Sequence, residues 1–206
     1  TKKFETLTHK NRMYSLDNSY SKEDLLDWEK RILKIVEAPI EYTCELKYDG
    51  ASINISYEKG LLTKAVTRGY GFQGDDVTAN IKTIKTLPLQ LQGDFLESFE
   101  IRGEIILPLD GFQKMNEDRL AAGEEMYANP RNTASGSLKL QDSREVANRP
   151  LDCLLYQVVV DKTNYKSHAE LLNAARNAGF KVPKTMLVAA NIEEVLQFIA
   201  DWDVKR

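Results

Sequence analysis

The sequence has little cysteine, no long apolar run and no large excess of either charge. Its two cysteines, Cys44 and Cys153, are too few for a disulfide scaffold or a cysteine-ligated zinc site, which favours a reducing, cytoplasmic setting. No apolar stretch approaches the roughly 20 residues of a membrane span, and the first residues show no signal-peptide pattern, so no membrane association is expected. The net charge of −3 gives the chain no overall attraction to nucleic acid, so any such contact needs a local basic patch.

What is present is typical of a globular protein. With 206 residues, 42% of them hydrophobic and 29% charged, the chain is long enough for one sizeable domain with a small appendage. It contains no internal repeat and no low-complexity linker.

The spacing of apolar residues predicts a mixture of helices and strands along the chain. Ser21 is the expected N-cap of the first helix, because the acidic Glu23 and Asp24 follow in its first turn. The expected helices are 22–36, 76–84, 109–121, 168–178 and 193–202. The expected strands are 41–49, 52–57, 61–68, 99–107, 151–160 and 185–189, with a hairpin turn at 58–60 and 151–160 as a central strand.

One charged stretch, residues 44–50, differs from an ordinary amphipathic strand. If it is extended, Glu45, Lys47 and Asp49 project from one face, and Gly50 follows as a bend. A lysine between two carboxylates can be oriented and deprotonated under control, which an amine nucleophile needs because a free lysine with a pKa of about 10.4 is protonated at neutral pH. The alternative is a solvated strand face.

The expected strand 99–107 carries a second line of alternating charges, namely Glu100, Arg102 and Glu104. Two such strands side by side predict a polar trough on a sheet rather than a solvated edge. Between the two charged stretches lies a glycine-rich loop, 67–76, with Arg68 at its start. Such loops bring backbone close to a ligand and often bind phosphate, but they are as often simple turns.

Residues 128–139 are small, polar and basic. Their backbone amides, hydroxyls and two cations suit contact with phosphates. The alternative is a capped short helix between two loops.

These motifs together resemble a known family. Lys47-Tyr48-Asp49-Gly50 matches the Lys-x-Asp-Gly signature of covalent nucleotidyltransferases, which are the DNA and RNA ligases and the mRNA capping enzymes. Five segments in order make the match specific and resemble the adenylation domain of bacterial NAD-dependent DNA ligase over essentially the whole chain: Ser15-Leu16-Asp17-Asn18, 44–47, 67–69, 101–104 and 128–138. The resemblance implies an α+β fold, with antiparallel β-sheets flanked by helices, of the ATP-grasp-like nucleotidyltransferase type.

The resemblance also implies roles for individual residues. Lys47 corresponds to the nucleophile that attacks the α-phosphorus of NAD to form lysyl-AMP, and Asp49 to the group that orients or deprotonates it. Glu45 lies at the position used at the adenine, next to the backbone of Ser15 and Leu16. The positions of Arg68 and Glu104 are those that hold the ribose.

For the later steps, the resemblance implies transfer of AMP to the 5′-phosphate of nicked double-stranded DNA and sealing with the 3′-hydroxyl, in DNA replication and repair. Arg131 and Lys139 fall where the family grips this DNA, although Lys139 replaces the usual arginine and loses its bidentate fork. Magnesium or manganese assists by neutralising phosphate charge. No residue of this chain is expected to form a metal site, and a monomer in the bacterial cytoplasm, associated with the nucleoid, is expected.

The sequence also departs from the family in its lysine motifs. The family offsets the two carboxylates near its nucleophile with lysines from two later motifs, and this sequence contains neither. We therefore expect a partial adenylation domain, with a helical region 1–38 and a nucleotide-binding core 39–206, that is weakly active or inactive alone. The nicotinamide-binding, OB-fold, zinc, helix-hairpin-helix and BRCT regions of the family are expected outside it, with zinc confined to those parts.

Three other interpretations stay open at this point. An ATP-dependent ligase or capping enzyme would share Lys47 and Asp49. A non-catalytic module that binds adenine nucleotide or nicked DNA would share the binding residues without the chemistry. A purely structural interpretation treats the charged strands as solvated faces.

Overall fold

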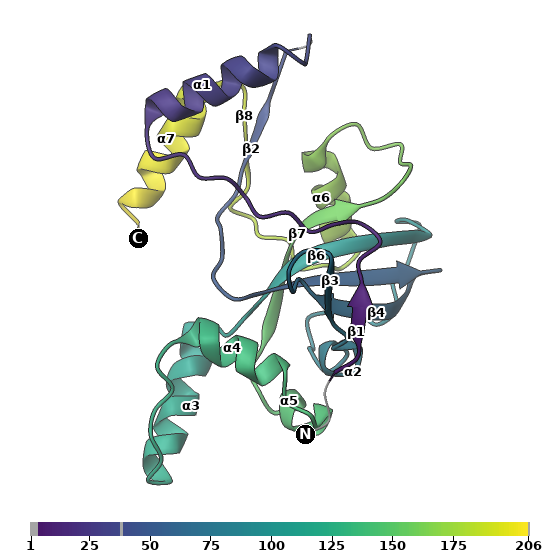
Figure 1. Cartoon of the computed structure of the whole chain (residues 1–206), viewed down its shortest axis with the longest axis vertical. Coiled ribbons are helices and arrows are strands. Elements are labelled where there is room, and N and C mark those ends of the chain that lie inside the picture. The colour runs from purple at the N-terminus through teal and green to yellow at the C-terminus, as the bar shows by residue number, and fades with distance from the viewer. Residues whose placement is uncertain (1–3, 38, 206) are drawn as a thin grey trace. The chain divides into compact units, whose positions relative to one another are not determined.

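The computed structural model describes residues 4–37 and 39–205, which form two compact units (Figure 1). Unit 1 comprises Thr1–Tyr14 and Tyr48–Pro183, and unit 2 comprises Ser15–Lys47 and Lys184–Arg206. Every strand pairing is antiparallel, and helices flank the sheets. The predicted α+β fold class is therefore confirmed.

The main sheet of unit 1 has four strands in the order β4-β3-β6-β7. They are β3 (Ala51–Glu58), β4 (Leu61–Thr67), β6 (Ser98–Ile106) and β7 (Asp152–Val159), close to the predicted ranges. The predicted hairpin joins β3 to β4 through Lys59 and Gly60, whose φ angles of 50° and 75° suit a two-residue turn. One face of the sheet carries the core, which includes Ile53, Ile55, Tyr57, Ile101, Ile105 and Leu155.

The expectation that 151–160 is a central strand is wrong, because β7 lies at the edge of the sheet. Its apolar run is nevertheless buried because other segments cover its outer side. The Leu155 amide donates to the Lys181 carbonyl at 3.0 Å. The Lys181 ammonium also pairs with the Asp152 carboxylate, which is 8% exposed.

Two short strands of unit 1 have no counterpart among the predictions. β1 (Thr6–Thr8) pairs with β5 (Gln73–Asp75), which follows the glycine-rich loop. The helix predicted over 76–84 is only the short α2 (Thr78–Ile81), and α5 (Ser143–Ala147) is also short. Elements of three to five residues are too short to show a hydrophobic period, which explains why they were missed.

Three longer helices complete unit 1. They are α3 (Leu109–Ala121), α4 (Pro130–Leu138) and α6 (His168–Asn177). Ser167 caps α6 as N-cap, and Gly123 and Gly179 follow α3 and α6 with φ angles of 73° and 104°, as expected of helix C-termini.

Unit 2 contains α1 (Lys22–Leu33), β2 (Tyr42–Cys44), β8 (Leu187–Ala189) and α7 (Ile192–Asp203). A capping box formed by Ser21 and Asp24 begins α1, which ends three residues before the predicted boundary. β2 pairs with β8, and the buried core is formed by Tyr42, Cys44, Ala189 and Ile192. Leu25, Leu26, Val195, Leu196 and Phe198 pack against it.

In the part of the chain that the structure describes, no helix is both long and apolar enough to cross a membrane.

Candidate active site

The predicted nucleophile and its carboxylate neighbours lie on an irregular segment rather than on a strand. β2 ends at Cys44, where its ladder with β8 also ends, so the strand predicted over 41–49 is wrong beyond this residue. The alternation nevertheless persists without a ladder, because Glu45, Lys47 and Asp49 are exposed whereas the residues between them are partly buried. Lys47 is the last residue of this segment in unit 2, and Asp49 belongs to unit 1.

Ser15 and Leu16, predicted to border the adenine, begin unit 2 with exposed side chains. The five remaining predicted residues belong to unit 1, namely Asp49, Arg68, Glu104, Arg131 and Lys139.

Gly50, which follows Asp49, packs tightly against the end of β6. A Cβ atom built at Gly50 would lie 2.1 Å from the Ile105 carbonyl oxygen and 3.2 Å from Glu104 Cγ. Only glycine allows this approach, which fixes the start of β3 beside Glu104. The Asp-Gly part of the predicted signature therefore adjoins a second predicted site residue.

A polar trough does form on the sheet, but between different strands from those predicted. In the β3–β6 ladder Ser52 faces Glu104, and Asn54 faces Arg102. The second line of the trough is thus β3, and not the charged segment 45–49, because that segment is not part of the sheet. The Ser52 hydroxyl donates to Glu104 Oε2 at 2.9 Å, which orients this carboxylate on the sheet.

Tyr156 is the residue of this trough that the sequence analysis missed. Its strand was interpreted as core, but a bulge opposite Arg102 and Gly103 shifts the β6–β7 register. The Tyr156 hydroxyl consequently lies 3.4 Å from Ser52 Oγ. A bulge leaves no signal in the hydrophobic pattern, so this placement could not be predicted.

The Tyr156 phenol is linked to the predicted residue Glu104 through Ser52, whose hydroxyl donates to Glu104 and lies 3.4 Å from that of Tyr156. Burial raises the pKa of the Tyr156 phenol, and the Glu104 carboxylate also raises it. The Ser52 hydrogen bond, and to a smaller extent the Arg102 and Arg68 guanidinium groups, lower that pKa without cancelling the increase.

Arg102 was predicted on a charged face, but it is 7% exposed and serves as an anchor. Its Nη2 donates to the carbonyls of Asn11 and Arg12 at 3.0 and 3.1 Å, and its Nη1 to Gln157 Oε1 at 3.3 Å. Residues 9–14, which we call the N-terminal strap, are thereby held to the sheet.

The N-terminal strap also binds the glycine-rich loop. The amides of His9 and Met13 donate to the carbonyls of Phe72 and Gly71 at 2.8 and 2.9 Å. The His9 ring is 8% exposed, and its Nε2 lies 3.1 and 3.2 Å from the carbonyl oxygens of Thr67 and Arg68. Since both neighbours are acceptors, Nε2 carries the hydrogen, and His9 fixes the backbone from which Arg68 projects.

Three buried polar atoms around this trough have no hydrogen-bond partner within the described residues: His9 Nδ1, Asn54 Oδ1 and Arg102 Nε. Buried polar atoms are almost always satisfied by protein, ordered water or ligand. The trough is therefore a polar site with unused donors and acceptors.

Residues 128–139 form a capped helix, the second of the two alternatives. Asn129 caps α4 by accepting the Asn132 amide at 2.8 Å, and Pro130 occupies the first turn. The helix buries Thr133, Ala134, Ser137 and Leu138 and leaves a small, cationic face exposed. This face suits phosphate contact too, because a Cβ built at Gly136 meets no atom within 4 Å.

The two cations of this face are held by carboxylates. Arg131 Nη1 lies 3.1 Å from Asp49 Oδ1, and Lys139 Nζ lies 2.8 Å from Asp75 Oδ2. Both pairs are substantially exposed, so each contributes little stability and leaves the cation available for exchange with a phosphate. The predicted DNA-binding residue Arg131 thus contacts the predicted catalytic residue Asp49.

A separate groove of about 480 Å³ lies between α3 and α5. Its arginines are already engaged, because Arg119 pairs with Glu124 at 2.8 Å and Arg149 donates to the Tyr127 hydroxyl at 3.1 Å. Asp118, Glu124 and Glu145 also line the groove, so acidic side chains outnumber its two arginines.

Residues 4–37 and 39–205 contain no cluster of three or more His, Cys, Asp or Glu side chains that could hold a metal ion.

Comparison with known proteins gives a consistent result. The family model of the NAD-dependent DNA ligase adenylation domain matches residues 1–206. The chain is 66% identical over 207 residues to a protein named DNA ligase from Flavobacterium psychrophilum and 62% identical over 206 residues to one from Christiangramia forsetii. A DNA ligase from Cytophaga hutchinsonii is 45% identical over 207 residues. Each match covers 100% of this chain but 31% of the relative's length.

The anchoring role of His9 predicts different effects for two substitutions of equal length. His9→Met removes the donor to the Thr67 and Arg68 carbonyls and should lower the free energy of unfolding by about 1–3 kcal/mol. His9→Gln keeps an amide donor at similar reach and should recover most of that loss. Urea denaturation measures both variants, and equal losses in the two would show that the ring contributes packing rather than hydrogen bonds.

Proposed function

This chain belongs to the NAD-dependent DNA ligase adenylation domain family, and from that premise we propose that its Lys47 carries AMP during the sealing of nicked DNA. The neutral Lys47 amine attacks the α-phosphorus of NAD, a nitrogen–phosphorus bond forms, and the bond to nicotinamide mononucleotide breaks. The amine proton is lost, and the product is a lysyl-AMP phosphoramidate. AMP then passes to the 5′-phosphate of the nick and leaves when the 3′-hydroxyl attacks.

Such a transfer depends mainly on positioning and on charge neutralisation, and the described residues offer both. Glu104 is oriented by Ser52, whose hydroxyl also lies 3.4 Å from that of Tyr156, and we assign Glu104 and Arg68 to the ribose as its acceptor and its cation. Glu45 and the backbone of Ser15 and Leu16 are assigned to the adenine. Asp49 orients Lys47 or accepts its proton.

The observation that carries this proposal is the tight contact of Gly50 with Ile105 and Glu104. It places the residue directly after Asp49 against the strand that holds Glu104. A signature that arose by chance on a solvated face would have no reason to require this contact.

Magnesium fits the residues only as an ion carried by substrate. Glu104 accepts from Ser52 and Asp49 pairs with Arg131, and the described residues contain no group of three or more His, Cys, Asp or Glu side chains that could hold a metal ion. Magnesium commonly binds one or two carboxylates together with substrate phosphates and water. When it is bound, it neutralises phosphate charge.

We assign the exposed face of α4 to the nicked DNA. Arg131 and Lys139 stand two helical turns apart on it, with the small residues Ser135 and Gly136 between them. A duplex backbone can therefore approach the helix closely, and the two cations can exchange their carboxylate partners for phosphates.

Lys47→Ala tests the nucleophile directly. In a longer protein that contains this chain at the length of its relatives, the variant should lose adenylation by NAD and nick sealing completely, because no other amine replaces Lys47. Nicked-DNA binding should persist. Mass spectrometry before and after incubation with NAD and magnesium measures the adduct, and Lys64→Ala, at an exposed lysine of β4, is the matched control.

The same measurement separates the competing functions. A non-catalytic module would show no adduct in the longer wild-type protein, and an ATP-dependent enzyme would be labelled by ATP instead of NAD. The 206-residue chain alone should gain AMP very slowly or not at all, because its sequence lacks the additional lysine motifs. Rapid stoichiometric labelling of this chain would refute that expectation.

The α4 assignment predicts how binding to nicked duplex depends on salt. Arg131→Gln and Lys139→Gln should each weaken binding and reduce the slope of log affinity against log salt by about 0.9, the value for one phosphate contact. Lys139→Arg should bind at least as tightly as the wild type, since it keeps the charge and adds a bidentate fork. Fluorescence anisotropy measures these slopes, and unchanged slopes in both glutamine variants would exclude this face.

A further inference from the structure

Three aromatic side chains of unit 1 are exposed on two segments that are hydrogen-bonded to each other. Tyr14, Tyr70 and Phe72 are 71%, 92% and 56% exposed. Tyr14 ends the N-terminal strap, and the other two lie on the glycine-rich loop, which is bonded to the strap through the Met13 amide and the Gly71 carbonyl. Exposed aromatic side chains that gather in this way commonly mark an interaction site.

Arg12 connects these rings. Its guanidinium carbon lies 4.0 Å from the centroid of the Phe72 ring and 4.8 Å from that of Tyr14. Unlike Arg119 and Arg131, its guanidinium makes no hydrogen bond or ion pair in the described parts of the chain. Stacking thus orients an exposed guanidinium while its N–H donors stay free, which prepares it for a phosphate.

The loop that displays Tyr70 has a fixed conformation. Gly69 and Gly71, on either side of Tyr70, have φ angles of 54° and 92°. A Cβ at Gly69 would lie 2.0 Å from the Gln73 carbonyl oxygen, and one at Gly71 would lie 2.5 Å from that of Met13. The backbone therefore holds Tyr70 outward, and a ligand that stacks on the ring meets a preorganised loop.

The charge of this surface differs in sign from that of the whole chain. Residues 9–14 and 68–74 contain Lys10, Arg12 and Arg68 but no aspartate or glutamate, whereas the chain carries a net charge of −3. Lys10 pairs with Asp161, which leaves the two arginines as its free positive charge. A partner of this surface should therefore be anionic and should carry flat apolar groups.

We propose that Arg12, Tyr14, Tyr70 and Phe72, which we call the aromatic platform, bind unpaired nucleotides of DNA, with bases stacked on the exposed rings and a phosphate on Arg12. Single-stranded nucleic acid combines the required properties, because every base offers a ring face and every linkage a negative charge. A blunt duplex hides its base faces and fits less well. Only the choice of DNA as the nucleic acid rests on the proposed function. The inference requires no reaction at Lys47.

The test is fluorescence anisotropy of the 206-residue chain with a labelled single-stranded oligonucleotide and with a blunt duplex of the same length. The single strand should bind, and binding of the duplex, to which the α4 face contributes, should not depend on Tyr70. Tyr70→Ala should weaken its binding about fivefold or more, whereas Tyr70→Phe, which keeps the ring, should stay within about twofold of the wild type. Arg12→Gln should reduce the salt slope by about 0.7, the value for one phosphate on a single strand.

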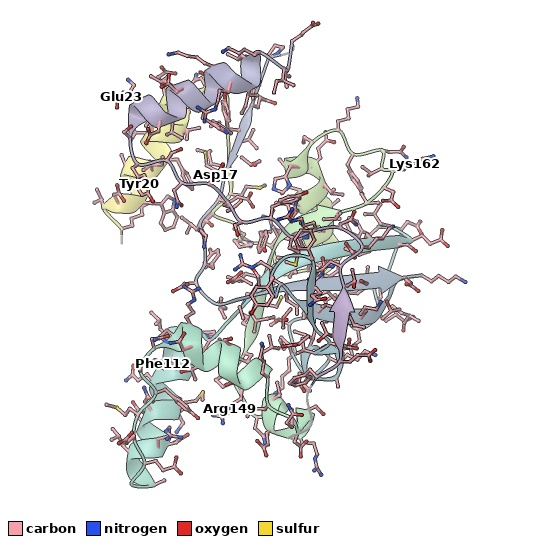
Figure 2. All side chains as sticks on the ribbon, viewed as in Figure 1. Asp17, Tyr20, Glu23, Phe112, Arg149 and Lys162 are labelled. Atoms are coloured by element: carbon pink, nitrogen blue, oxygen red, sulfur yellow. The ribbon has the colours of Figure 1, made fainter. Side chains whose placement is uncertain are left out.

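Two matched variants make the outcome specific. Tyr20→Ala removes a tyrosine that is 87% exposed and precedes α1 in unit 2 (Figure 2), and it should leave binding unchanged. Lys47→Ala should also bind the single strand like the wild type, so loss of adenylation and loss of platform binding are separate results. Absence of single-strand binding, equal single-strand affinities for the wild type and Tyr70→Ala, or an equal loss of duplex binding in Tyr70→Ala would overturn the proposal.

Discussion

The pairing of β3 with β6 is the constraint on which the candidate site of unit 1 depends. Eight residue pairs fix the register, from Ala51 opposite Ile105 to Glu58 opposite Ser98. Because side chains alternate along a strand, this register puts Ser52 and Asn54 on the same face as Arg102 and Glu104, and leaves the isoleucines of both strands for the core. A slip by one residue would bury the polar groups and expose the core, so the site and the fold have one structural cause.

The N-terminal strap extends this constraint to the glycine-rich loop. The buried side chains of Arg102 and His9 donate hydrogen bonds to backbone carbonyls rather than to substrate. These hydrogen bonds hold the strap, residues 9–14, and the loop residues 67–72 together. The close contacts of Gly50 with Ile105 and of Gly71 with Met13 have the same consequence. Each contact fixes the backbone next to an exposed residue, which is Asp49 beside Gly50 and Tyr70 beside Gly71. The exposed polar and aromatic side chains of unit 1 therefore project from a backbone that buried polar side chains hold in place.

Much of the fold could be predicted from the sequence, because it has strong local signals. Ser21 and Ser167 mark helix starts, Gly123 and Gly179 follow helix ends, and α3 has the predicted bounds. The prediction of a strand over 41–49 was wrong beyond Cys44 because alternating charges resemble a strand pattern whether or not a partner strand exists. The prediction that 151–160 is a central strand was wrong because an apolar run indicates only that a strand is buried. β7 lies at the edge of the sheet and is buried because another segment covers it.

The candidate site, too, could be predicted only in part from the sequence. Residue motifs led to the family, but the position of Tyr156 beside Ser52 depends on a bulge that has no sequence signal. The aromatic platform could not be predicted from the sequence either, since Arg12 and Phe72 are 60 positions apart in the chain and meet only because the strap binds the glycine-rich loop.

The most direct measurement of the central claim is a crystal structure of the chain after soaking with NAD. The account predicts the adenosine half of NAD next to Glu104 and Arg68, with its α-phosphorus within bonding reach of Lys47 Nζ; NAD bound elsewhere, or a Lys47 amine directed into solvent away from it, would contradict the account.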